Sequence, residues 1–184
     1  MQPPLMAQPR KTAAEARAEV EARRREERQA KAATLDERFR EATPGARLLR
    51  ASWLGTALLL AGCVWGIVDF DEHELTGGLI GSTVVSLGLF AAGCVAFLAA
   101  IWAGAQRSRT HVLGIGGWFF LAGSAPNRVR WQLLGAVGAQ VVIGIVAASV
   151  RPFSPLAFST LCWVYGLGIC GWWGALHGEF AERP

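Results

Sequence analysis

The sequence predicts an all-α membrane protein: a four-helix transmembrane bundle made of two helical hairpins, preceded by a charged N-terminal cytosolic helix. Three observations lead to this fold class. The 184 residues are 52% hydrophobic, and four apolar runs each have the roughly 20 residues needed to cross a bilayer core of about 30 Å. Charged residues are concentrated in residues 1–50. Arginines flank alternate connections between the runs.

Residues 1–50 form a polar segment with ten Arg and two Lys against eight Asp and Glu. Residues 1–11 are rich in proline and are expected to be disordered. Residues 12–45 are expected to form a charged helical arm, because Ala, Glu and Arg are good helix formers. Thr34 and Glu37 fit a capping box and predict that a second helix begins there, with Leu35 and Phe39 resting on the membrane.

Four spans follow the arm and pair into hairpins. The second span, at roughly 27 residues, is long enough to tilt or protrude. The expected segments are the first hairpin at 46–104 (spans at about 51–70 and 78–104), a cytoplasmic connecting loop at 105–129, the second hairpin at 130–178 (spans at about 130–150 and 156–177), and a cytoplasmic tail at 179–184.

Basic residues set the expected orientation. Four arginines stand before the first span and four lie between the second and third, whereas Arg151 is the single basic residue between the third and fourth. Cytoplasmic loops carry an excess of Lys and Arg. We therefore expect a multi-pass protein of the cytoplasmic (inner) membrane with both termini in the cytoplasm. The inner flanking residues are Arg38, Arg40, Arg47, Arg50, Arg107, Arg109, Arg128 and Arg130.

Residues 112–122 of the connecting loop are apolar but too short to span a membrane. Their glycine density argues against a stable helix. Two interpretations remain: an interfacial or packed loop under the bundle, which we favour, and a re-entrant loop, which would need cover from protein at depth.

The two hairpins match each other at a constant offset of 78 residues. If real, the match predicts a parallel repeat with a pseudo-two-fold axis along the membrane normal. The alternative is that apolar spans resemble each other by composition. The informative identities are Arg50/Arg128, Trp53/Trp131, Gly66/Gly144, Ile67/Ile145 and Val68/Val146.

Small residues predict where helices approach closely, because pairs of small residues four apart promote association in lipid. Three glycine pairs fit, and packing within the bundle is favoured over a dimer face for them: Gly62/Gly66, Gly77/Gly81 and Gly174/Gly178. In the fourth span, a longer small-residue stripe is the best candidate for a tight contact: Gly166, Cys170, Gly174 and Gly178.

Gln140 is the most polar residue near the middle of a span. An amide is costly in lipid, so we expect Gln140 to face the interior and hydrogen-bond between helices. A substrate contact is the alternative. His177 lies at the end of the fourth span, where it could act as a cation on the helix C-terminus or, less favourably, as a haem ligand.

The acidic segment between the first two spans comprises Asp69, Asp71, Glu72, His73 and Glu74. Carboxylates can hold a divalent cation, but no calcium-loop spacing is present. A solvated turn is therefore the favoured interpretation.

Several function classes are disfavoured. The four cysteines fall inside apolar runs, form no C-x-x-C pair and are interpreted as reduced, buried small residues. No catalytic triad, zinc motif or cofactor motif is present, so we expect no enzyme activity, metal or cofactor. The basic balance has no interleaved aromatic patch, so nucleic-acid binding is not expected.

The layout resembles the small, uncharacterised four-span membrane proteins of high-GC actinobacteria. The resemblance rests on the charged arm, the four spans and the terminal segment from Tyr165 to His177, YGLGICGWWGALH. That group carries no known activity, so the resemblance implies a fold and no function.

The leading functional hypothesis is a non-catalytic accessory or scaffold subunit of a cytoplasmic-membrane complex. It rests on the charged helix, which would gain most from a membrane or cytosolic protein partner bound through residues 12–45. The alternative is a small transporter or flippase for a lipid-linked or small solute, working as a homo-oligomer. In both cases the lipid bilayer is the expected surrounding.

Overall fold

The computed structural model describes residues 13–38, 44–71 and 74–183. The expected disorder of residues 1–11 and the expected position of Phe39 lie outside this part of the chain, as do Glu72 and His73 of the acidic segment.

Within the described residues, four helical segments are long and apolar enough to cross a membrane, which confirms the predicted all-α fold. The 31 residues of α3 make a helix of about 45 Å at 1.5 Å per residue, longer than a bilayer core. The four segments are α2 (Ala46–Val68), α3 (Gly77–Arg107), α5 (Asn127–Val150) and a fourth span, Pro155–His177.

The fourth span is not one continuous α-helix. It begins as a 3₁₀-helix, η1 (Pro155–Leu161), and continues as α6 (Trp163–His177). 3₁₀ segments are usually short, because their hydrogen-bond geometry is poorer than that of an α-helix. The seven residues of η1 are therefore longer than usual. The change of helix type falls at Cys162, about a third of the way along the 23-residue span.

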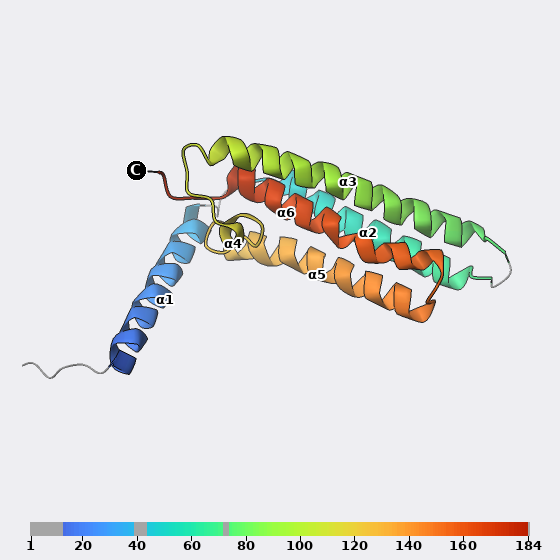
Figure 1. The fold of residues 1–184 in the computed structure, drawn as a ribbon, viewed down its shortest axis with the longest axis horizontal. Helices are drawn as coiled ribbons and strands as arrows, with labels where there is room; N and C mark the ends of the chain where they lie inside the picture. Colours follow the sequence, from blue (N-terminus) through green and yellow to red (C-terminus); the bar gives the residue numbers. More distant parts are fainter. Residues whose placement is uncertain (1–12, 39–43, 72–73, 184) are drawn as a thin grey trace, which may run out of the picture.

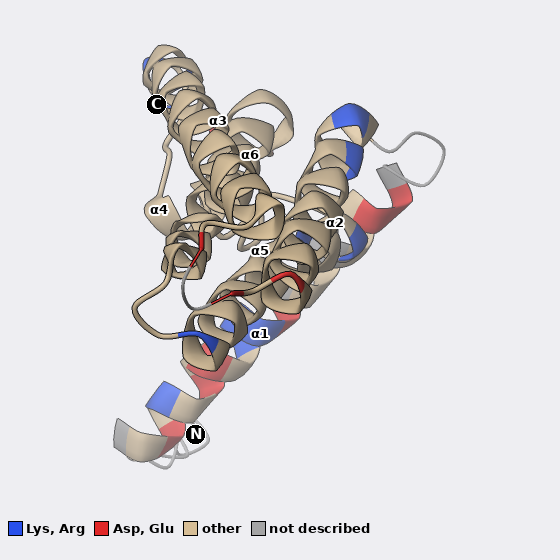
Figure 2. Ribbon diagram, turned by 90° about the vertical axis from the view of Figure 1, so that its right-hand side faces the viewer, with Lys and Arg blue, Asp and Glu red and all other residues tan. Residues whose placement is uncertain are grey.

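The four spans run side by side in an elongated bundle (Figure 1). α3 packs along α6 and α2, and α5 packs against α2, η1 and α6. Within the described residues, charged side chains lie on α1, in the connections, at the helix ends and in the tail, and the bodies of the spans carry none (Figure 2). An uncharged surface of this kind is what a bilayer core requires.

The N-terminal arm is one helix, α1 (Ala13–Arg38). The prediction of a second helix beginning at Thr34 is wrong: the Thr34 hydroxyl donates to the Ala30 carbonyl at 3.0 Å, as Thr does inside a helix. Leu35 is 1% exposed and therefore packs inside the protein instead of resting on the membrane.

The backbones of α3 and α6 approach each other closely. A Cβ added at Gly93 would lie 2.5 Å from the Tyr165 backbone nitrogen, and one at Gly168 would lie 2.7 Å from the Gly93 carbonyl oxygen. Neither position can accept a larger residue unless the two backbones separate. The predicted parallel repeat is not settled by this arrangement and stays a prediction.

The connecting loop and the C-terminal tail close one end of the bundle. The loop contains a single helical turn, α4 (Ile115–Trp118). The backbone N–H of Val112 donates to Ala181 and that of Arg183 donates to Thr110, so the tail runs beside the start of the loop. The tail residues are therefore part of the folded end of the molecule.

Candidate functional site

Gln140 joins three of the four spans near their midpoints. Its Nε2 donates to the Thr56 hydroxyl of α2 at 2.9 Å. Its Oε1 accepts the backbone N–H of Gly166 in α6 at 3.1 Å. The side chain is 1% exposed. A buried amide without partners would be costly in this setting, and here both of its heteroatoms are engaged by protein.

The Gly166 N–H is available because α6 begins only three residues earlier, at Trp163. The first four N–H groups of an α-helix have no partner within it. A helix that starts inside a bilayer must find an acceptor elsewhere. The Gln140 side chain supplies one, so the change from η1 to α6 and the amide at Gln140 form one structural unit.

The same polar layer extends along α2. The Thr56 hydroxyl donates back to the Ser52 carbonyl at 2.9 Å, and the Tyr165 hydroxyl donates to the Ala51 carbonyl at 2.9 Å. Ser52 is fully buried, and its hydroxyl oxygen has no hydrogen-bond partner among the described atoms. The layer thus contains fixed dipoles and no ionisable carboxylate or amine.

The predicted small-residue stripe of the fourth span does not face a single helix. Gly166 contacts Gln140 and Val137 of α5, and Cys170 is fully buried in the core. Gly174 lies against the Trp118 carbonyl of the loop, and Gly178 lies beside Phe180 of the tail. The stripe therefore allows three different contacts along α6.

The other glycine pairs pack within the bundle. A Cβ at Gly62 would touch Val85, and one at Gly66 would lie 2.7 Å from the Ser82 hydroxyl, so both glycines face α3. Gly81 lies under the ring of Trp65, because a Cβ added there would stand 2.6 Å from a ring carbon, and Gly77 borders the same ring.

Arg107, not His177, provides the cation at the C-terminus of α6. Its Nη1 donates to the Ala175 carbonyl at 2.9 Å, and its guanidinium lies 5.4 Å from the Phe180 ring centre. A cation at the last carbonyls complements the helix dipole. The His177 ring instead lies against Trp173, with 5.6 Å between ring centres.

The described part of the acidic segment has a structural role. Asp69 Oδ2 accepts the Gly78 N–H at 2.7 Å, and the Thr76 hydroxyl accepts the Leu79 N–H. Together they cap α3. Among the described residues, no group of three or more His, Cys, Asp or Glu side chains is arranged to hold a metal ion. All four cysteines are free thiols.

Loop residues 112–122 pack against the bundle. Trp118 Nε1 donates to the Gly171 carbonyl at 2.9 Å, and Phe119 stacks on Phe97 of α3 with 5.2 Å between ring centres. Gly171 is six residues from the end of α6, which places the Trp118 indole about 9 Å along that helix. The loop fills the space between the ends of α3 and α6.

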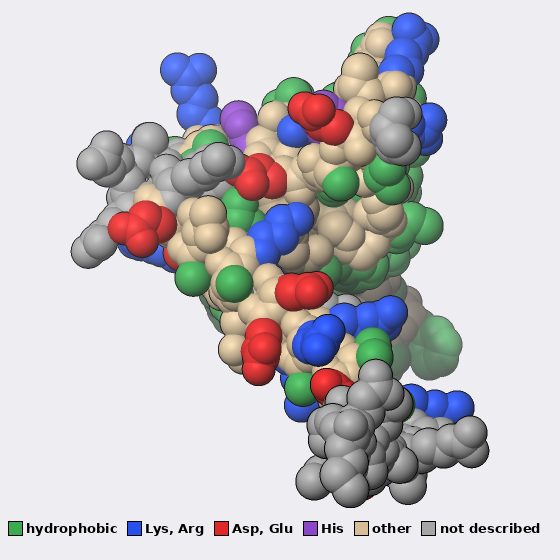
Figure 3. Space-filling view, turned by 90° about the vertical axis from the view of Figure 1, so that its left-hand side faces the viewer, with side chains coloured by type: hydrophobic (Ala, Val, Ile, Leu, Met, Phe, Trp, Pro, Cys, Tyr) green, Lys and Arg blue, Asp and Glu red, His purple; other side chains and the backbone are tan. Residues whose placement is uncertain are grey.

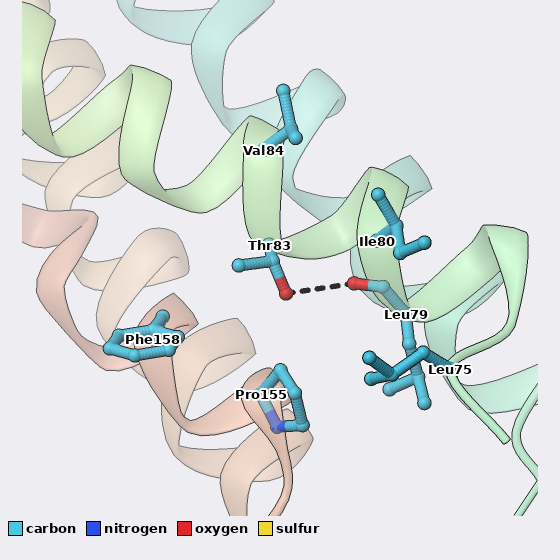
Figure 4. Close-up of a pocket in the computed structure, with 7 residues that line it drawn as sticks. All are labelled: Leu75, Leu79, Ile80, Thr83, Val84, Pro155 and Phe158. Atoms are coloured by element: carbon cyan, nitrogen blue, oxygen red, sulfur yellow. Dashed lines mark hydrogen bonds between the residues drawn. The ribbon is translucent and has the colours of Figure 1, made fainter.

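Among the described residues, a groove opens on the surface at each end of the bundle. A groove of about 260 Å³ lies between α3 and η1, and its lining is almost entirely apolar (Figure 4). The hydroxyl of Thr83, its main polar group, donates to the Leu79 carbonyl. The second groove, about 300 Å³, lies between α2 and α5 and contains Arg50, Trp53 and Gln132.

Sequence reasoning identified Gln140 but missed its partners. Thr56 lies seven residues before Cys63 on the inward face of α2, and this spacing was a usable signal. Gly93 and Gly168 were missed as a close backbone contact, although Ala96, Ala100 and Gly104 continue a small face from Gly93 along α3. Nothing in the sequence alone indicated the 3₁₀ start of the fourth span.

The fold and site define a class: a multi-pass α-helical membrane protein with a polar, uncharged layer at mid-span. No protein family, curated protein or solved structure matches the chain.

Proposed function

We propose that this chain is a non-catalytic accessory or scaffold subunit of a cytoplasmic-membrane complex, and that α1 is the element that contacts its partner. The observation that carries the proposal is the contrast between the two ends of α1. One end is fixed to the bundle, and the rest is exposed.

The fixed end is held by Leu35 and Asp36. Leu35 is buried, and the Asp36 carboxylate accepts the N–H of Asn127, the first residue of α5, at 3.1 Å. A carboxylate at a helix N-terminus is favourable because it meets the positive end of the helix dipole. The base of α1 is therefore coupled to a membrane span.

The remainder of α1 projects away from the bundle (Figure 1). Every described side chain from Ala14 to Thr34 is exposed, and basic and acidic groups are mixed over its surface (Figure 3). Arg23 pairs with Glu19 at 3.7 Å and Arg25 with Glu21 at 3.9 Å. Exposed pairs of this kind contribute only a few tenths of a kcal/mol each. Because most of the stability of a helix in a protein comes from packing, contact with a partner would stabilise this helix considerably.

The proposed orientation places α1 in the cytoplasm, because arginines gather at the same end of the bundle as α1. The partner would then be a cytosolic protein or the cytosolic part of another membrane protein. Val20, which is 50% exposed, gives the charged helix an apolar contact point.

The test is purification of the full chain from its native host in mild detergent, followed by mass spectrometry of co-purifying proteins. The informative deletion is residues 1–33, since it keeps Leu35, Asp36 and the Pro44 carbonyl and so leaves the bundle contacts intact. A matched variant exchanges Glu19 with Arg23 and Glu21 with Arg25. It keeps composition and helix pairs but alters the charge pattern.

A stoichiometric partner that is lost with residues 1–33 and weakened by the charge exchange would support the proposal. A chain that purifies alone, or a partner retained by the deletion, would contradict it.

A transporter or flippase is the second candidate, and the discontinuous fourth span favours it. Transporter sites are often built where a broken helix presents its N-terminal amides at mid-membrane, as α6 does beside Gln140. The transporter hypothesis is disfavoured by Gln140, because both ends of its amide are already hydrogen-bonded within the protein. Solute uptake or lipid scrambling by the purified chain in vesicles, abolished by Gln140→Leu but not by deletion of residues 1–33, would favour transport.

A further inference from the structure

The groove between α2 and α5 lies at the end of the bundle where α1 is attached. It is lined by Ala46, Leu49, Arg50, Trp53 and Gln132, with a volume of about 300 Å³. Ala46 begins α2, and Trp53 lies about 10 Å further along it at 1.5 Å per residue. Gln132 lies about 8 Å from the start of α5 by the same rise. The groove therefore covers the depth at which a bilayer changes from headgroups to hydrocarbon.

The polar groups of the groove suit a phosphate. Arg50 is exposed and forms no ion pair with any described residue. Its guanidinium offers planar N–H donors that match phosphate oxygens, and Gln132, which is half-buried, can add an amide donor. Two kinds of donor, one from each of two spans, thus line the same groove.

The apolar part of the groove suits the glycerol and chains of a lipid. Leu49 in its lining is buried, and Trp53 is 47% exposed at the expected interface. One turn deeper, α2 presents exposed Ala57, and α5 presents Gly135, where an added Cβ would meet no atom within 4 Å. Small side chains at these positions leave room for an acyl chain below the headgroup.

The electrostatics of this end favour an anion. Arg47 and Arg128 are exposed near the starts of α2 and α5, and both helices direct the positive ends of their dipoles here. The carboxylates of Asp36 and Glu37 are also at this end, and that of Asp36 accepts the Asn127 N–H. Basic pockets between spans on the cytoplasmic side are typical sites for anionic lipid headgroups.

We propose that this groove binds one anionic phospholipid, with the phosphate on Arg50 and Gln132 and the glycerol region against Trp53. An acyl chain runs towards the membrane centre past Ala57 and Gly135. The apolar groove between α3 and η1 at the opposite end has no cation in its lining and takes no part in this recognition. The lipid site does not depend on the partner proposed for α1.

The test uses the full chain, delipidated in mild detergent and mixed with phosphatidylglycerol or phosphatidylcholine of identical acyl chains. Bound lipid is counted by native mass spectrometry. We expect one phosphatidylglycerol to remain bound at concentrations where phosphatidylcholine does not. Arg50→Gln should weaken phosphatidylglycerol binding at least about tenfold, because hydrogen bonds to a charged group contribute about 1.5–3 kcal/mol. Inorganic phosphate should not displace the lipid.

The matched control is Arg109→Gln, which removes the same charge from an exposed position outside the groove and should leave the affinity unchanged. Gln132→Ala provides a second variant, expected to weaken binding by a smaller factor. Arg50→Lys keeps the charge but not the planar fork and should give an intermediate affinity. Helix content and elution volume check that each variant folds.

A second readout is thermal stability. A lipid that binds only the folded chain raises its melting temperature, so phosphatidylglycerol should stabilise the native chain and the Arg109→Gln variant more than Arg50→Gln. Equal retention of both lipids, or equal loss of binding in Arg50→Gln and Arg109→Gln, would overturn the proposal. Displacement by inorganic phosphate at similar concentration would also overturn it, since the ligand would then be a free anion.

Discussion

The indole Nε1 of Trp173, in α6, donates a 2.9 Å hydrogen bond to the carbonyl of Pro44, in the turn that precedes α2. Trp173 is fully buried. A Cβ added at Gly45 would lie only 2.5 Å from the Nε1 atom of Trp173, so the indole leaves no room for a side chain there. Gly45 has a φ of 68°, the left-handed region that glycine adopts readily. The start of α2 is therefore fixed to the end of α6.

Trp173→Phe should lower the free energy of unfolding by about 1–3 kcal/mol, because it leaves the Pro44 carbonyl without its donor and opens a small cavity. The matched control is Trp131→Phe, since Trp131 is 72% exposed and should change stability by less than about 0.5 kcal/mol. Reversible unfolding in mixed micelles measures both. Equal effects would show that the buried indole has no special role.

Gln140→Leu should destabilise the bundle by about 1–3 kcal/mol, because the Gly166 N–H and the Thr56 hydroxyl both lose a partner inside the membrane. Hydrogen bonds between spans contribute about 0.6 kcal/mol on average in double-mutant cycles. Thr56→Val combined with Gln140→Leu should therefore be less harmful than the sum of the two single changes. Strict additivity would contradict the contact between the two side chains.

The packing of α3 against α6 can be tested by enlarging one glycine side chain at a time. Gly93→Leu should disrupt the bundle, because its side chain meets the α6 backbone and overpacking costs about 1–3 kcal/mol or more. Gly88→Leu, five residues earlier on the same helix, should be tolerated, since nothing lies within 4 Å of its Cβ position. Monodispersity in size-exclusion chromatography and the unfolding midpoint report the difference. Similar behaviour of the two variants would refute this packing.

The sequence was sufficient for the spans because hydrophobicity over about 20 residues has one physical cause, the bilayer core. Gln140 could be placed inward for a related reason: an amide avoids lipid. The hydrogen-bond partners of Gln140 could not be predicted, because the Gly166 N–H that its Oε1 accepts is available only where α6 begins. The preceding segment, η1, packs against α5 and α3, and such contacts between distant parts of the chain are not visible in a local sequence pattern.

Two local sequence patterns did not determine the contacts of their residues. The capping box at Thr34 and Glu37 is a local pattern, and it was overridden because Leu35 and Asp36 have contacts with the bundle that a continuous helix supplies. The small-residue stripe of the fourth span was the best candidate for a tight helix contact. Its glycines contact α5, the connecting loop and the tail in turn, and contacts with a loop or a tail are not visible in a helical spacing.

Arg107 provides the last prediction. Its guanidinium donates to the Ala175 carbonyl and lies over Phe180, so it joins the end of α3 to the end of α6 and to the tail. Arg107→Gln removes the charge that complements the α6 dipole and should lower stability by about 1–2 kcal/mol. Arg109→Gln, two residues further on and exposed, should have little effect.

Hydrogen exchange resolves where the loss of stability in Arg107→Gln occurs. If the contact holds the tail, backbone amides that pair the tail with the loop, such as Val112 and Arg183, should exchange faster in Arg107→Gln, while amides near Gln140 should not. Unchanged exchange at Val112 and Arg183 would mean that the tail is held by its backbone pairing alone.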